Sequence, residues 1–87
     1  MVNIDKYIVE FLGTLFLTYI ILLTGNYLAI GAALAIPVYL GGNISGGAFN
    51  PAVAIAMYYQ GKLPVADLIP YILSQVLGGL VALLIIG

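Results

Sequence analysis

The sequence predicts an all-α membrane protein with three transmembrane helices and one shorter helix that enters the lipid and leaves on the same side. Of its 87 residues, 64% are apolar and only 6% are charged, whereas a soluble domain carries about 25% charged residues. Of three apolar runs, the first and the third approach or exceed the roughly 20 residues that a helix needs to cross a bilayer, and the second is shorter. Between the second and third runs lies a segment rich in Gly and Asn that is too irregular to cross.

The three expected spans are separated by residues that end helices. Residues 7–24 form the first span, which stops at a Gly-Asn pair where glycine can terminate a helix. Because charges of both signs occur among the first ten residues, we expect a retained span rather than a cleaved signal peptide. Residues 27–40 form a shorter second span, which is expected to stop at Gly41 and Gly42, and residues 65–86 form the third. The third span is about 33 Å long at 1.5 Å per residue, which allows a tilted crossing.

Residues 42–60 predict a coil followed by a half-length helix. The coil is rich in glycine, and Asn50 followed by Pro51 is a strong helix-start signal. The helix that follows would be about 15 Å long, half the thickness of the hydrocarbon core. It carries no Lys or Arg, which disfavours the alternative of a helix lying on the membrane surface. Irregular backbone at membrane depth must be buried or line a watery cavity, so the segment predicts a polar cavity near the midplane.

The residue types that are missing exclude several functions. The chain has no Cys, no His and no Arg, and its net charge is −1. It therefore has no thiolate nucleophile, no usual general base and no basic surface for nucleic acid. No set of residues suggests a metal site, a cofactor or an enzyme. Glu10, a carboxylate about one turn into the first span, is the residue that costs most free energy to place inside the membrane. Ionisable residues within spans tend to face the bundle interior.

Three motifs in order resemble those of the aquaporin and glycerol-facilitator family, also called the major intrinsic proteins. Residues 42–53, Gly-Asn-Ile-Ser-Gly-Gly-Ala-Phe-Asn-Pro-Ala-Val, resemble its first signature loop. Residues 10–14, Glu-Phe-Leu-Gly-Thr, resemble its first-helix motif. Tyr71, Gln75, Gly78 and Gly79 resemble its third-helix motif. The chain departs from the family at two positions: the family usually has His where this chain has Asn43, and often has His where this chain has Ala48.

The resemblance implies half of an aquaporin fold. Family members carry two repeats inverted in the membrane and two Asn-Pro-Ala loops, whereas this chain carries one repeat. The resemblance therefore implies a pore completed by a second copy in the opposite orientation, an antiparallel homodimer, with four dimers forming a possible octamer. Two Lys residues on one predicted face give only a small orientation bias, so dual topology is expected.

The resemblance also assigns pore residues. Asn50, Pro51 and Ala52 would form the meeting point of two half-helices, with the Asn50 side chain donating hydrogen bonds to the solute. The alternative is that Asn50 merely caps a helix. The carbonyl groups of the coil, Ser45, Gly46, Gly47 and Ala48, would line the channel.

A narrow filter is expected from Ile30 of one copy with Val38, Gly47 and Val53 of the other, although Ile30 and Val53 could instead face lipid. The filter would be apolar and would lack the family's Arg, which implies a wider and less water-selective constriction. Glu10 and Gln75 are expected to support the coil through hydrogen bonds.

Small residues four apart predict close helix crossings. They are Gly31 with Ala35 and Gly78 with Ala82, and Gly13 is expected to serve a similar purpose. These small residues are expected to allow close packing of helices and not to contact a solute.

The leading functional hypothesis is a passive channel in the lipid bilayer for water or small neutral solutes such as glycerol. The alternative is an antiparallel-dimer ion- or proton-coupled transporter that uses Glu10. A third class is a membrane assembly that transports nothing, such as a lesion former, but these usually carry a charged tail. In every case the protein is expected to be an integral, multi-pass membrane protein.

Overall fold

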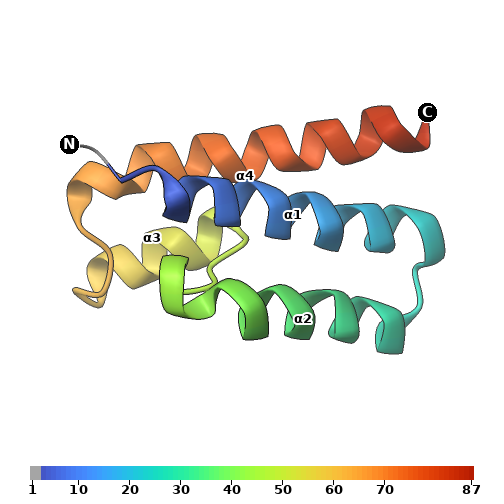
Figure 1. Ribbon diagram of the computed structural model, residues 1–87, viewed down its shortest axis with the longest axis horizontal. Coiled ribbons are helices and arrows are strands. Elements are labelled where there is room, and N and C mark those ends of the chain that lie inside the picture. Colours follow the sequence, from blue (N-terminus) through green and yellow to red (C-terminus); the bar gives the residue numbers. More distant parts are fainter. Residues whose placement is uncertain (1–2) are drawn as a thin grey trace.

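The computed structural model describes residues 3–87 as four helices, with no strand in this range. They are α1 (Asp5–Thr24), α2 (Tyr27–Ser45), α3 (Pro51–Tyr59) and α4 (Val65–Ile86) (Figure 1). Three of them, α1, α2 and α4, are long and apolar enough to cross a membrane. The predicted all-α class with three spans and one short helix is confirmed.

The turn between α1 and α2 forms where the sequence predicts it. Gly25 adopts a left-handed φ of 61° and its N–H donates to the carbonyl of Ile21, which closes α1. Asn26 caps α2, because its side-chain oxygen accepts hydrogen bonds from the backbone N–H groups of Leu28 and Ala29. The two helices therefore run antiparallel with a minimal connection (Figure 1).

Helix α2 is longer than predicted, so the expected end at Leu40 is wrong. It continues to Ser45 and ends where Gly46 adopts a φ of 87° and donates its N–H to the carbonyl of Gly42. Gly41 is a packing residue rather than a stop, because a Cβ at this position would collide with the side chain of Val9 on α1. Glycine costs a helix only about 1 kcal/mol, and close packing against α1 offsets this cost.

Helix α1 lies between α2 and α4, and α3 packs against α4 (Figure 1). The α1–α4 crossing is close, since a Cβ on Gly78 would lie 2.5 Å from the backbone oxygen of Phe11. By contrast, a Cβ on Gly31 would meet nothing within 4 Å, so the small pair predicted there makes no crossing within one chain. Gly13 faces a side chain from the coil rather than a helix.

The coil and α3 occupy one half of the bundle. After α2 ends, the coil turns back toward the middle of the long axis, and α3 runs outward again to the end where α1 and α4 begin (Figure 1). The start of α3 therefore lies about midway along the three long helices. This arrangement gives the segment the shape of a loop that enters and leaves on one side.

The interior of the bundle is partly polar and its exterior is apolar. The buried polar residues are Glu10, Thr14, Ser45, Asp67 and Gln75, whereas most large aliphatic side chains are exposed. A soluble protein shows the reverse, but lipid solvates apolar surface and leaves polar groups to be satisfied inside. A small apolar cluster of Ala48, Ala54, Leu63 and Tyr71 connects the coil with α3 and α4.

Candidate pore site

The coil at residues 46–50 is short and unusually wound. Gly46 and Gly47 have φ values of 87° and 69°, and Phe49 has a φ of 53°. The left-handed region suits glycine but strains a bulky residue such as Phe49. Strained backbone of this kind persists only where neighbouring groups hold it.

Glu10 holds the coil from beneath. Its side chain is 0% exposed. The Oε1 atom accepts hydrogen bonds from the N–H of Phe49 (2.7 Å) and from Nε2 of Gln75 (2.8 Å). The Oε2 atom accepts from Oγ of Ser45 (2.7 Å) and from the N–H of Ala48 (3.2 Å). The carboxylate thus receives four donors from three segments of the chain.

The Glu10 contacts also orient the coil carbonyls. No peptide bond among the described residues is cis, and in a trans peptide the carbonyl points opposite to the following N–H. Because the N–H groups of Ala48 and Phe49 point at Glu10, the carbonyls of Gly47 and Ala48 point away from it. This is the arrangement that a carbonyl-lined pathway requires.

Ser45 differs from its expected place, because it is the last residue of α2 and not part of the coil. Its hydroxyl donates to Glu10 and accepts from the N–H of Gly47 (3.1 Å). Its carbonyl accepts a 2.6 Å hydrogen bond from the hydroxyl of Tyr71. Ser45 therefore joins the end of α2 to both α1 and α4.

Tyr71 also contacts the candidate site, and sequence reasoning gave it no role there. It lies four residues before Gln75 on α4, so the two side chains share the face that supports the coil. The four-residue spacing of Tyr71 and Gln75 was the sequence signal that could have indicated this contact. Gln75 itself contacts Glu10 rather than the coil backbone. Its Oε1 atom and the Thr14 hydroxyl oxygen are buried without a hydrogen-bond partner among the described residues.

Asn50 caps α3 and remains exposed. Its Oδ1 atom accepts a 2.7 Å hydrogen bond from the N–H of Ala52, and Pro51 occupies the first helical position. Because the oxygen faces the backbone, the amide nitrogen with its two donors points elsewhere, and within residues 3–87 it donates to no group. Ala52 and Val53 are exposed beside it. The start of α3 therefore presents donors and small side chains to the surface.

The expected filter residues are only partly together in one chain. Val38 lies next to the coil, since its Cγ2 atom would be 3.4 Å from a Cβ on Gly47. Val38 and Val53 are both exposed. Ile30 lies eight residues before Val38 on α2, about 12 Å along the helix axis and toward the opposite end of the bundle. One chain therefore does not bring Ile30 to Val38 and Gly47.

An ion pair, which the sequence interpretation missed, joins the starts of α1 and α4. Nζ of Lys6 lies 2.6 Å from Oδ2 of Asp67, and the hydroxyl of Tyr7 donates to Oδ1 over 2.7 Å. The ring of Tyr7 meets that of Tyr71 edge-on, with centroids 6.0 Å apart. These contacts connect the end of the bundle to the side chain that holds Ser45.

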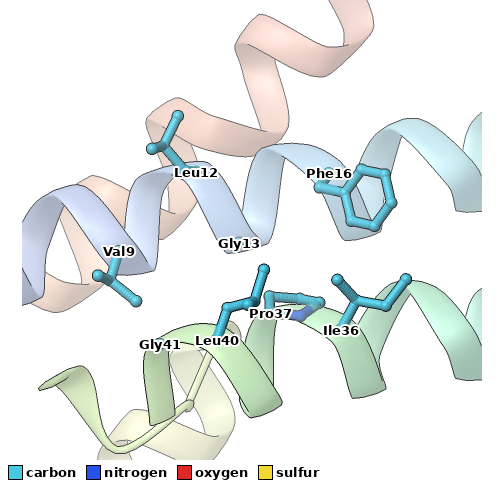
Figure 2. A pocket seen from close by; sticks show the side chains of 8 residues that line it. All are labelled: Val9, Leu12, Gly13, Phe16, Ile36, Pro37, Leu40 and Gly41. Atoms are coloured by element: carbon cyan, nitrogen blue, oxygen red, sulfur yellow. The ribbon is translucent and has the colours of Figure 1, made fainter. Parts of the chain in front are cut away.

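An open groove of about 380 Å³ lies between α1 and α2. Its walls are apolar and are formed by Val9, Leu12, Gly13 and Phe16 of α1 and by Ile36, Pro37, Leu40 and Gly41 of α2 (Figure 2). It offers no polar side chain to a solute, so the groove is not the candidate site. No group of three or more His, Cys, Asp or Glu residues able to hold a metal occurs in the part of the chain described.

The whole chain is similar in sequence to a known protein family. Residues 1–87 match the family described as Major intrinsic protein. The protein "Glycerol uptake facilitator protein-like 6" of Lactiplantibacillus plantarum is 46% identical over 86 residues, covering 88% of this chain and 40% of that protein. "Aquaporin Z" of Photorhabdus laumondii is 47% identical over 58 residues, covering 67% and 25%. "Aquaporin Z" of Rhodopseudomonas palustris is 36% identical over 95 residues, covering 92% and 40%.

The chain spans less than half the length of each of these relatives. No solved structure matches it significantly. The family pattern nevertheless covers every residue, including the coil held by Glu10 and the capped start of α3. The resemblance carried by the three motifs is thus confirmed, and the chain belongs to the major intrinsic protein family, whose members are integral membrane proteins.

Proposed function

We propose that the protein is a passive channel for water and small neutral solutes such as glycerol, with the pore formed between two oppositely oriented copies. The observation that carries the proposal is the place of Asn50. It starts a half-length helix about midway along the bundle, is exposed, and has an amide nitrogen free to donate. Pro51 and Ala52 complete the meeting point.

The electrostatics of α3 favour neutral solutes. A helix N-terminus carries about half a positive charge, and α3 points its N-terminus toward the middle of the bundle (Figure 1). Two such ends facing one another place a positive potential at the centre of the passage. This potential repels cations and hydronium, while water and hydroxyl groups can accept from Asn50 and donate to the carbonyls of Gly47 and Ala48.

The incomplete lining of one chain supports pairing of two copies. Asn50, Ala52 and Val53 lie on an exposed surface, which must be covered or hydrated at membrane depth. A two-fold axis in the membrane plane would bring two such surfaces together and would place Ile30 of one copy nearer the Val38, Gly47 and Val53 of the other. The lining would be apolar apart from Asn50 and the coil carbonyls, which favours small polyols alongside water.

The charge distribution supports insertion in both orientations. Lys6 is paired with Asp67, and Lys62 follows the end of α3 at the same end of the bundle. Two Lys residues at one end give a weak topological signal. Insertion in both directions would permit antiparallel dimers, and the family resemblance suggests that four such dimers group together.

The transporter alternative is less well supported. The family is one of membrane channels and not of enzymes, and Glu10 is engaged on both oxygens by four donors. A carboxylate so occupied suits a fixed structural anchor, whereas a proton carrier must exchange its partners during transport.

The test compares the same substitution at two helix caps. Asn50→Asp keeps an oxygen that accepts from Ala52, but it removes the amide donors and adds a negative charge at the pore. Asn26→Asp makes the same change at the cap of α2, away from the pore. In proteoliposomes under an osmotic step, we expect fast, low-activation-energy shrinkage for wild type and Asn26→Asp. Asn50→Asp should slow water flux and admit cations.

The proposal makes two further demands on this experiment. Asn50→Trp should abolish water and glycerol flux, because its side chain would fill the passage. Wild-type vesicles that shrink no faster than empty ones would refute a channel, and equal fluxes for Asn50→Asp and Asn26→Asp would remove Asn50 from the pathway.

A further inference from the structure

We propose that Phe49 is a positioning residue, which sets the direction of the neighbouring Asn50 amide by seating its ring on Gly13 of α1. The inference rests on the proposed function, since it deepens the role of the same site. It assigns to the residue before the Asn-Pro-Ala motif a task that the motif itself does not explain.

The ring of Phe49 is fitted closely to α1. Its side chain is 2% exposed. A Cβ added to Gly13 would lie 2.5 Å from Cδ1 and 2.7 Å from Cζ of this ring, and closer still to Cε1. A real Cβ essentially never approaches so near. Only glycine at position 13 therefore leaves room for the ring in this position.

The backbone of Phe49 is held by the same face of the same helix. Its N–H donates to Oε1 of Glu10 over 2.7 Å, and Glu10 and Gly13 are three residues apart on α1, which makes them neighbours on one face. Residue 49 is thus clamped at two points, one on the backbone and one on the ring. This clamp accounts for a φ of 53° in a residue that is not glycine.

The clamp has a direct consequence for the next residue. The direction in which Asn50 leaves the coil is set by the dihedral angles of Phe49. Asn50 then caps α3 with its oxygen, so the amide nitrogen points wherever the backbone turns it. A shift of the ring on α1 would rotate the Asn50 donors relative to the passage without removing any atom from the pore.

A ring that merely fills space would behave differently. Glycine adopts a left-handed φ without strain, so Phe49→Gly would relax the backbone while removing the ring. If the ring only occupied volume, the cap on α3 would survive this change. If the ring positions Asn50, the cap should loosen even though the backbone strain is gone.

The first measurement is hydrogen exchange of the Ala52 amide, which donates to Oδ1 of Asn50. We expect exchange to quicken about tenfold in Gly13→Ala, because an added methyl group overpacks the ring. The matched control is Gly79→Ala, whose Cβ would sit at an ordinary 3.7 Å from Thr18, and it should leave the exchange rate unchanged. Phe49→Gly should quicken it as well.

A double variant tests the contact itself. Leu at position 49 lacks Cε1 and Cζ, two of the three ring atoms that a Cβ at Gly13 would meet, and its Cδ1 can turn aside by rotation of the side chain. Gly13→Ala combined with Phe49→Leu should therefore restore slow exchange at Ala52. Such recovery is a coupling between the two sites rather than a sum of two losses. Exchange at Ala52 that stays at the wild-type rate in Gly13→Ala, or losses that simply add in the double variant, would overturn the inference.

Measurements of water and glycerol flux distinguish a failure of this inference from a failure of the proposed function. In proteoliposomes, Gly13→Ala should lower water permeability severalfold and shift the ratio of water to glycerol permeability, and the double variant should recover both. If wild type conducts and Gly13→Ala keeps the wild-type ratio, the positioning role fails while the channel stands. If wild type conducts nothing but the Ala52 pattern appears, the channel fails while the positioning of Asn50 stands.

Discussion

Glu10 is a buried carboxylate with no cation among its hydrogen-bond partners, and its charge is met by four donors instead. Glu10→Gln would present an NH2 group to donors that need an acceptor. We expect the free energy of unfolding to fall by about 2 kcal/mol, the usual cost of a buried polar group left unsatisfied. Thermal unfolding in detergent measures this effect, with exposed Asp5→Asn as a control that should change little.

The same variant separates the two functional classes at the residue scale. In a passive channel, any loss of flux in Glu10→Gln follows the loss of stability and does not depend on a pH gradient. A variant that stays as stable as wild type, yet loses a flux that followed the proton gradient, would favour the coupled transporter.

At the scale of elements, the crossing of α1 and α4 depends on Gly78. A Cβ there would meet the backbone of Phe11, which cannot move aside as a flexible side chain can. We expect Gly78→Ala to lower the free energy of unfolding by about 2 kcal/mol, measured by unfolding in mixed micelles. Gly79→Ala, one residue further, has ordinary contacts and should be neutral or stabilising. Equal effects at both positions would contradict the close crossing.

The end of α2 gives a second prediction at this scale. Tyr71→Phe removes the donor to the Ser45 carbonyl and should cost about 1 kcal/mol. Exchange of the Gly46 N–H, which closes α2 on Gly42, should quicken because the last turn loses its tie to α4. Tyr39→Phe is the control, since Tyr39 is 86% exposed. An unchanged Gly46 rate would mean that the last turn holds itself.

At the scale of the whole molecule, the arrangement of copies can be read by cross-linking. The chain has no cysteine, so Ala52→Cys introduces a single thiol at the start of α3. In antiparallel pairs these positions meet near the two-fold axis, and we expect Ala52→Cys to cross-link to its own copy. Leu84→Cys, near the far end of α4, should not, because antiparallel copies place Leu84 on opposite sides. Cross-linking at Leu84 and not at Ala52 would indicate parallel copies.

Local patterns in the sequence were enough to predict the membrane class, the three spans and the start of α3. Composition and the length of an apolar run are properties of consecutive residues, and lipid selects for them directly. The Asn50-Pro51 signal is equally local, because a cap and a first helical residue act within one turn. The family motif then pointed to the residues that surround this start.

Contacts between distant residues settled the remaining features. Glu10 meets Gln75 across 65 positions of the chain, and Lys6 meets Asp67 across 61. Gly41 looked like a helix stop but lies inside α2, because glycine serves both for turning and for close packing, and only the neighbouring Val9 distinguishes the two. Phe49 gave no local sign of its left-handed backbone. These features depend on which groups the fold brings together, and no stretch of consecutive residues contains that information.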